Sequence, residues 1–226
     1  MKKLFFLLSF LLMVIVSQSQ DIKFVVQEKL NVGLDMIKDF KYVNNQYLFL
    51  NKSTLKTMDM KGNELNSKSV EGVNGFDWSD GKIQTISSKN NINSNTKYSD
   101  KYSLEMKFLS PYEDGYFTCK VITAGNSVSY SSAIVFVDNS GNEKIFDYIE
   151  GVPSGLFEKD GKLYYVLSKN VKGENGFLKV YDIMTKSNAG IEEIPVVDPV
   201  GISIDTEGNF YSYSSFTNEI IKFRRK

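Results

Sequence analysis

The chain contains no histidine and only one cysteine among its 226 residues. Without histidine there can be no Ser-His or Cys-His catalytic pair, no histidine-based zinc site and no imidazole proton shuttle. A single cysteine excludes a disulfide within the chain. Cys119 alternates with bulky residues between Tyr116 and Ile122, which predicts a buried structural thiol rather than a nucleophile. Any catalysis would therefore rest on carboxylates, tyrosine, lysine or a bound metal.

The chain also lacks a net charge, because it has 27 basic and 27 acidic residues. Loss of Lys2 and Lys3 with the leader described next leaves 25 basic and 27 acidic residues, a net charge of −2. Such a balance gives no electrostatic reason to expect nucleic acid or an anionic membrane as a partner.

One long apolar run occurs, and it lies at the N-terminus. Lys2 and Lys3 precede an apolar segment at residues 4–16, and small residues follow at positions 17–19. This is the layout of a secretory signal peptide, and the run is shorter than the roughly 20 residues that span a bilayer. We predict a signal peptide at residues 1–20 and a single domain at residues 21–226, in a secreted or periplasmic protein that has no membrane contact after cleavage. An uncleaved anchor is the alternative.

Helical patterning is scarce as well. No window sustains apolar residues at a spacing of 3.6 together with a helix cap. The 13 Tyr and 16 Phe residues fall in short segments that are separated by Asn, Gly and Ser, which is typical of β-strands and turns. We therefore predict an all-β domain. A β-sandwich would also contain many short strands, so the choice of architecture depends on the repeat.

A repeat of about 40 residues runs through the chain. Its unit is a glycine, an alternating strand, a tight turn and an aromatic-rich strand. Clear copies begin at Gly75, Gly155 and Gly201, and a looser copy begins at Gly33. Gly, Asn and Asp tolerate the positive φ angles of hairpin turns. The turns of the repeat fall at Asn45, Gly81, Gly115, Gly161 and Gly208. Five units favour a β-propeller with five four-stranded blades.

The third unit is the least regular of the five. Residues 112–117 supply its turn, but no glycine opens its inner strand. Residues 87–102 are polar and rich in Asn, and we predict that they form a long loop within the second unit.

The two ends of the chain complement each other. Residues 201–223 have the pattern of three strands, and residues 24–30 have the pattern of one strand ahead of the first repeat. In the other units, a strand of this kind is the fourth of its blade. A ring that is closed by its chain ends leaves few free sheet edges. We therefore predict that the N-terminal strand completes the last blade.

The motif Asp-x-x-Gly-Asn occurs at Asp59, Asp138 and Asp205. It lacks the alternating acidic ligands of a calcium-binding loop. Because Asp, Gly and Asn favour tight turns, hairpin turns are the prediction at all three positions.

One segment resembles a blade of the NHL and SMP-30-like β-propeller superfamily. Residues 197–211 contain Pro-Val-Gly-Ile-Ser-Ile-Asp followed by Gly-Asn-Phe-Tyr, and residues 218–223 supply an Ile-x-x-Phe strand. Residues from Val152 onward are similar to this pattern less fully. The resemblance implies the propeller fold, and a six-bladed-like ring is its alternative blade count. It does not choose a function, because propellers host binding, scaffolding and hydrolysis alike.

Two carboxylates are weak catalytic candidates. Asp35 and Asp77 each follow the glycine of their unit by two residues, and Phe157 and Ser203 hold that place in two other units. Carboxylates on adjacent inner strands could bind Ca²⁺ or form an acid/base pair. Each could equally accept a hydrogen bond from the neighbouring backbone. SMP-30-like lactonases hold a metal with acidic and Asn side chains. No full ligand set matches here, so we predict no metal site and no cofactor. Ca²⁺ is the alternative, since it is the ion that carboxylates at the channel could bind.

Trp78 and Ser203 are weak binding candidates. An exposed aromatic near the channel would suit a sugar or a peptide, whereas the alternation of the strand around Trp78 predicts core packing. With no catalytic motif in the sequence, the favoured function is a binding protein for a peptide, glycan or protein partner. The alternative is a carboxylate- or metal-dependent hydrolase, similar to a glycosidase or a lactonase, and a scaffold within a larger assembly is a third hypothesis.

Overall fold

A computed structural model describes residues 23–79, 81–87, 102–124, 130–169 and 172–226. The predicted signal peptide lies outside these residues. The described part contains eighteen strands and no helix, so no helix there is long and apolar enough to cross a membrane. The strands are β1 (Phe24–Asn31), β2 (Ile37–Val43), β3 (Gln46–Asn51), β4 (Thr54–Met58), β5 (Glu64–Ser69), β6 (Val73–Ser79), β7 (Lys82–Ser87), β8 (Tyr102–Tyr112), β9 (Gly115–Ala124), β10 (Tyr130–Asp138), β11 (Glu143–Glu150), β12 (Gly155–Lys159), β13 (Lys162–Leu167), β14 (Asn175–Asp182), β15 (Ser187–Val197), β16 (Pro199–Ile204), β17 (Phe210–Ser214) and β18 (Glu219–Arg225).

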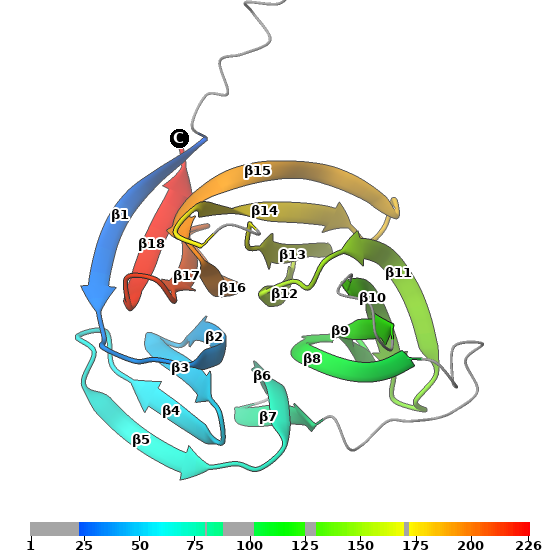
Figure 1. Ribbon diagram of the computed structural model, residues 1–226, viewed down its shortest axis with the longest axis horizontal. Helices are drawn as coiled ribbons and strands as arrows, with labels where there is room; N and C mark the ends of the chain where they lie inside the picture. The colour runs from blue at the N-terminus through cyan, green and yellow to red at the C-terminus, as the bar shows by residue number, and fades with distance from the viewer. Residues whose placement is uncertain (1–22, 80, 88–101, 125–129, 170–171) are drawn as a thin grey trace, which may run out of the picture.

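The strands form five antiparallel sheets around a common axis (Figure 1). Blade one is β2 to β5, blade two is β6 and β7, blade three is β8 to β11, blade four is β12 to β15, and blade five is β16 to β18 with β1. The inner strands β2, β6, β8, β12 and β16 each contact the next, and β16 contacts β2, so the ring is closed. The molecule is a β-propeller, as the sequence predicts.

Blade two is smaller than the other four blades within the described residues. Its sheet has two strands, whereas the prediction was four strands in every blade. The loop that we predicted over residues 87–102 falls almost wholly outside the described residues, which resume at Tyr102 with β8.

The N-terminal strand closes the last blade. β1 pairs antiparallel with β18, with Phe24 opposite Arg225, and the two strands lie side by side in Figure 1. The Phe24 ring packs edge-on against Phe210 and Phe223, with ring centroids 5.5 and 5.4 Å apart. Burial of these rings ties the first strand to the last one, and the predicted closure by the chain ends is confirmed.

The Asp-x-x-Gly-Asn motifs are hairpin turns. The Asp138 carboxylate accepts hydrogen bonds from the backbone N–H groups of Ser140 and Asn142 at 2.9 and 2.8 Å, and from the Asn142 amide at 2.9 Å. The Asn142 side chain, followed by its backbone N–H, lowers the pKa of Asp138. Asp59 and Asp205 make the same three bonds within their own turns. All three carboxylates are therefore occupied by turn formation.

Glycine is required where neighbouring inner strands nearly touch. A Cβ on Gly75 would lie 2.4 Å from the Phe108 Cα, and a Cβ on Gly201 would lie 2.3 Å from the Phe40 carbonyl oxygen. Gly33 does not belong to this set, because it precedes β2 and a Cβ there would meet nothing within 4 Å. In blade one the equivalent position, just after the irregularity in the β2 register, holds Asp39.

The core lies between the blades. Cys119 is fully buried in the cluster between blades three and four, and burial raises the pKa of its thiol to about 12. The prediction of a buried structural thiol is confirmed, because a thiol at that pKa carries almost no thiolate at neutral pH.

Candidate functional site

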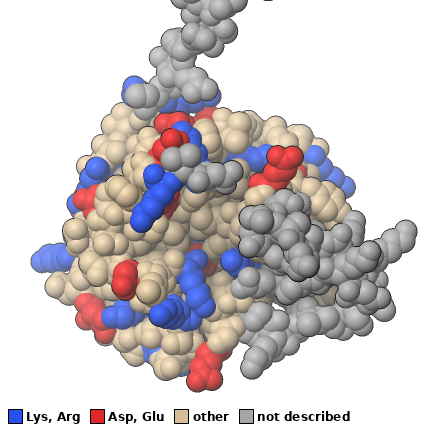
Figure 2. Space-filling view, viewed as in Figure 1, with Lys and Arg blue, Asp and Glu red and all other residues tan. Residues whose placement is uncertain are grey.

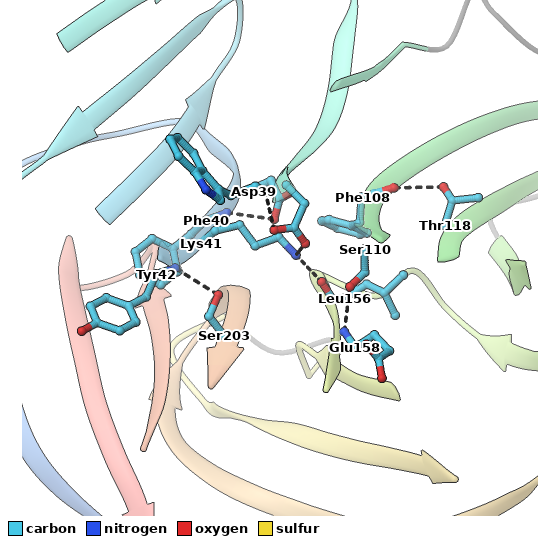
Figure 3. Close-up of polar contacts among 12 residues, drawn as sticks. Asp39, Phe40, Lys41, Tyr42, Phe108, Ser110, Thr118, Leu156, Glu158 and Ser203 are labelled. Atoms are coloured by element: carbon cyan, nitrogen blue, oxygen red, sulfur yellow. Dashed lines mark hydrogen bonds and ion pairs between the residues drawn. The ribbon is translucent and has the colours of Figure 1, made fainter. Parts of the chain in front are cut away.

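One position on each inner strand lies near the axis of the ring. The position is defined by the pairing of each inner strand with the strand that follows it. Counted from the turn between these two strands, it belongs to the third pair of opposite residues in every blade. In blade five the first pair is Asp205 and Asn209, which are joined by a backbone hydrogen bond. From blade one to blade five the residues at this position are Lys41, Asp77, Ser110, Phe157 and Ser203. Figure 3 shows the side chains from β2, β6 and β8 converging there.

Lys41 occupies the centre of this group. Its side chain is fully buried, and its Nζ lies 3.5 Å from the Asp77 Oδ2. The same ammonium donates a hydrogen bond to the Leu156 carbonyl and lies 5.4 Å from the centroid of the Phe157 ring. One cation therefore joins blades one, two and four at the axis (Figure 3).

Asp39 and Asp77 share that one cation. The Asp39 Oδ1 accepts a hydrogen bond from the Phe40 N–H at 2.9 Å, whereas its buried Oδ2 has no hydrogen-bond partner among the described residues. Burial raises the pKa of Asp39 to about 7 against the attraction of Lys41, and repulsion from Asp77 adds to the rise. Burial also raises the pKa of Asp77, and again Lys41 opposes the shift.

Serine side chains join two other pairs of blades. The Ser203 Oγ accepts a hydrogen bond from the Tyr42 N–H at 3.0 Å, which links blade five to blade one. The Ser110 Oγ accepts one from the Glu158 N–H at 2.7 Å, which links blade three to blade four. The same hydrogen bond cannot form between blades two and three. Asp77 holds the place of the serine in blade two, but the residue of β8 that is equivalent to Tyr42 and Glu158 is Pro111, which has no N–H.

A cavity of about 360 Å³ opens at the end of the ring where the inner strands begin. We call it the mouth cavity. Figure 2, which looks down the axis of the ring, shows basic side chains gathered close to its centre. The inner strands of blades one, two, three and five and the segment that leads into β12 form the wall, and none of the described residues that line the cavity is acidic. The lining residues are Ile37, Lys38, Asn74, Lys107, Phe108, Val152, Pro153, Ser154 and Val200.

The wall of the mouth cavity contains a strained residue. Phe108 has a φ of +62°, in the left-handed region, at the place where blade five has Gly201 with a φ of +69°. Phe108 is 2% exposed, and its side chain packs in the core cluster between blades three and four. Such strain persists only where the surrounding structure holds it, and it is common at functional sites.

A second cavity of about 450 Å³ lies at the opposite end, between blades three and four. Its floor is an aromatic cluster in which Phe117 lies 5.2 Å from Phe136 and 5.1 Å from Phe146, ring centroid to ring centroid. Met184, at its edge, is 81% exposed. Acidic and basic side chains both line it, so its charge favours neither kind of ligand.

The structure separates the two predicted carboxylates. Asp35 lies before β2 in an exposed segment, whereas Asp77 is 3% exposed on β6. The expected equivalence of Asp35 and Asp77 is wrong because Gly33 is not an inner-strand glycine. Asp39 and Lys41 are the residues that meet Asp77. Counting three pairs back from the predicted turn at Asn45 would have identified Lys41.

The two predicted binding residues serve packing in this structure. Trp78 is half-buried and packs against the cluster of Leu48, Leu50 and Phe76 between blades one and two. Ser203 is fully buried, with its hydroxyl engaged by Tyr42. Among the described residues, no three His, Cys, Asp or Glu side chains are grouped in a way that could hold a metal ion.

No protein-family model matches the chain, and no curated protein matches it. Solved structures with a similar arrangement include the WD40 β-propeller domain of Doa1, at 9% identity and a TM-score of 0.45, with 90% of this chain and 97% of that chain covered. The WD40 domain of Neurospora crassa Pan2 is 10% identical at a TM-score of 0.43, with coverage of 83% and 74%.

The Dos1 propeller is 12% identical at a TM-score of 0.43. The match covers 79% of this chain but only 53% of that chain, so this protein spans about half its length. At such low identities these structures carry no information on ligand or activity. The propeller assignment rests on the sheet topology and the closed ring of inner strands.

Proposed function

We propose that this protein is an exported β-propeller that binds a peptide or protein partner in the mouth cavity and performs no chemistry at the axis. The observation that carries the proposal is the mouth cavity itself. Among the described residues, it is a concave surface formed by the inner strands of four blades and by the segment that leads into β12, and its volume lies within the range of small-ligand pockets.

The axis supports binding better than hydrolysis. A general acid or base must come within hydrogen-bond reach of the substrate. Asp39 and Lys41 are fully buried, and Asp77 is 3% exposed and paired with Lys41. None of the three lines the mouth cavity. The hydrolase alternative therefore has weaker support, since the carboxylates already serve the contact between blades.

Export and lineage are parts of the same proposal. The pattern of residues 1–20 supports export, because a signal peptide carries a basic start and a short apolar run. An NHL-like lineage draws support from residues 197–223, whose motif coincides with β16 to β18 and the Asp205 turn.

A peptide display experiment tests the proposal. Residues 21–226 are immobilised, and random heptapeptides are selected on the wild type and on Val152→Trp, which fills the mouth cavity. We expect peptides enriched on the wild type to lose binding to Val152→Trp. Met184→Trp, at the exposed edge of the second cavity, is the matched control and should leave binding unchanged.

Two results would overturn the proposal. One is a set of peptides that bind Val152→Trp as well as the wild type, or that depend on Met184. The other is robust turnover of glycoside or lactone substrates by the purified protein. Melting temperatures of Val152→Trp and Met184→Trp that equal the melting temperature of the wild type would show that both variants are folded.

A further inference from the structure

Blades one and two meet at the axis through a charge cluster in which two carboxylates share one cation. Lys41 and Asp39 come from β2, Asp77 comes from β6, and all three residues are buried (Figure 3). The Lys41 Nζ lies 3.5 Å from the Asp77 Oδ2, whereas the Asp39 Oδ2 has no hydrogen-bond partner among the described residues. We call these three residues the axial cluster. The cluster is electrically neutral when Asp39 is protonated and has an excess of negative charge when Asp39 is ionised.

Two charged groups act on Asp39 within the core. Lys41 on its own strand favours ionisation, and Asp77 on β6 opposes it. Two further lysines, Lys38 of β2 and Lys107 of β8, line the mouth cavity. The other three inner strands present uncharged side chains at the axial position, and these are Ser110, Phe157 and Ser203.

Protonation of Asp39 is therefore coupled to opening of the axial cluster. Burial raises the pKa of Asp39 in the closed ring to about 7, whereas its ordinary value is 3.8. In an opened cluster the carboxyl group meets water and returns toward that ordinary value. The closed cluster holds the proton more tightly, so its stability is complete below pH 3.8 and declines as the pH rises through about 7. Between pH 5 and pH 8 the open population should rise about 30- to 100-fold.

Blades one and two differ in how they are joined to the rest of the ring. Blade one meets blade five through the hydrogen bond from the Tyr42 N–H to the Ser203 Oγ, and the Tyr42 ring stacks on Tyr211 with centroids 3.9 Å apart. Between blades two and three the equivalent hydrogen bond cannot form, because Asp77 faces Pro111, which has no N–H. When the axial cluster opens, blade two is therefore the blade that separates.

Backbone strain at the contact between blades two and three favours the same opening. A Cβ on Gly75 would lie 2.4 Å from the Phe108 Cα, which shows how closely β6 and β8 approach each other. At this contact Phe108 has a φ of +62°, which is unfavourable for a bulky residue. Separation of β6 from β8 would let this backbone relax. Blade two thus has a pH-dependent contact on one side and a strained contact on the other.

We propose that the axial cluster is a pH-sensitive switch, in which ionisation of Asp39 releases blade two from blade one while the rest of the ring stays closed. The inference concerns the ring itself, so it stands whether or not a ligand occupies the mouth cavity. Lys38 of β2 and Asn74 of β6 both line that cavity. Opening of the cluster separates these two parts of the wall and lets a ligand leave sideways at alkaline pH.

Native-state hydrogen exchange tests the proposal, because the protection of an amide reports the free energy of the opening that exposes it. After correction for intrinsic exchange rates, amides of β6 and β7 should lose about 30- to 100-fold of their protection between pH 5 and pH 8. At pH 8 they should be less protected than amides of β16 and β17. Low concentrations of urea should change their protection little, because a local opening exposes little surface.

A matched pair of aspartate variants locates the switch. Asp39→Asn keeps the size of the side chain and removes its charge, so the loss of protection in β6 and β7 should shrink to less than about threefold. Asp35→Asn, at an exposed residue just before β2, is the matched control and should keep the pH dependence of the wild type. Circular dichroism at pH 5 checks that both variants are folded.

The wild type alone can overturn the proposal, whatever the variants do. Equal protection and equal urea dependence of amides in blades two and five would show that Asp39 acts only through global unfolding of the ring. A pH dependence that persists in Asp39→Asn would assign the effect to other groups and would reject the switch. The switch would also be rejected if Asp35→Asn abolished the pH dependence as Asp39→Asn does.

Discussion

The inner ring joins its blades by two kinds of chemistry at the same position. Between blades five and one, and between blades three and four, a buried serine hydroxyl accepts a backbone hydrogen bond. Between blades one and two, Lys41 and Asp77 form a buried ion pair instead. The equivalent positions therefore perform one structural task with neutral groups at two junctions and with charges at a third.

The two solutions differ in how completely they satisfy their polar groups. Each serine junction pairs one donor with one acceptor and leaves no charge in the core. The charged junction places two carboxylates around one ammonium, and the Asp39 Oδ2 has no partner among the described residues. A buried ion pair can cost more in desolvation than it returns, but loss of one partner is severe. Blades one and two should therefore respond most strongly to mutation and to pH.

The largest effect should follow from removal of the shared cation. Lys41→Met leaves Asp77 and Asp39 buried without a counter-charge, and we expect the free energy of unfolding to fall by about 3–5 kcal/mol. Urea denaturation followed by tryptophan fluorescence measures the change. Lys68→Met, at an exposed lysine, should stay within about 0.5 kcal/mol of the wild type.

Gly201→Ala should rank next. The new Cβ meets the backbone of Phe40 at 2.3 Å while φ is +69°, so strain and steric clash add to about 2–4 kcal/mol. Gly208→Ala is the control, because its φ is +81° but nothing lies within 4 Å of the new Cβ. We expect the control to lose about 1 kcal/mol. Equal losses would show that the approach of the inner strands is looser than described.

The charged junction should make stability depend on pH. The folded pKa of Asp39, about 7, lies above its ordinary value of 3.8, so the folded state holds the proton more tightly than the unfolded state. This contribution is complete below pH 3.8 and is lost as the pH rises through about 7. We expect a fall on the order of 2 kcal/mol between pH 5 and pH 8.

Asp39→Asn is the variant that checks this pH dependence. It should flatten the decline, since the amide does not titrate. Denaturation curves at several pH values for the wild type and the variant measure the difference. An unchanged slope in the variant would assign the pH dependence to other groups.

The neutral junction should give the smallest change. Ser203→Ala removes the acceptor of the half-buried Tyr42 N–H, and we expect a loss of about 1 kcal/mol. The loss should be the same at pH 5 and pH 8, because neither group titrates in that range. A loss that varies with pH would contradict the distinction between neutral and charged junctions.

Local sequence patterns predicted much of the fold. The turn residues and the alternation of each strand are local properties, and they located all five hairpins at the inner strands as well as the closing strand β1. The error at Gly33 had a physical cause. Gly33 was expected to be the inner-strand glycine of blade one. That position of β2 holds the buried residue Asp39 instead, and an aspartate does not match the glycine pattern of the other repeats.

The candidate site was harder to predict, because it forms only when the ring closes. Lys41 bonds to Leu156, which lies 115 residues away in the sequence. Local pattern assigns a lysine in a strand to solvent, and nothing near Lys41 in the sequence indicates its burial. The mouth cavity likewise combines short segments that lie far apart in the sequence, so it becomes visible only in the folded protein.

A double-mutant cycle on Lys41→Met and Asp77→Asn, measured by urea denaturation at pH 6, tests most directly whether the charges at the axis hold the ring together. At that pH, Asp39 is mostly protonated in the folded protein and contributes little charge. The account predicts a coupling free energy of at least about 2 kcal/mol, with the double variant more stable than either single variant. Additive effects of the two substitutions would contradict it, because the charges would then act independently of each other.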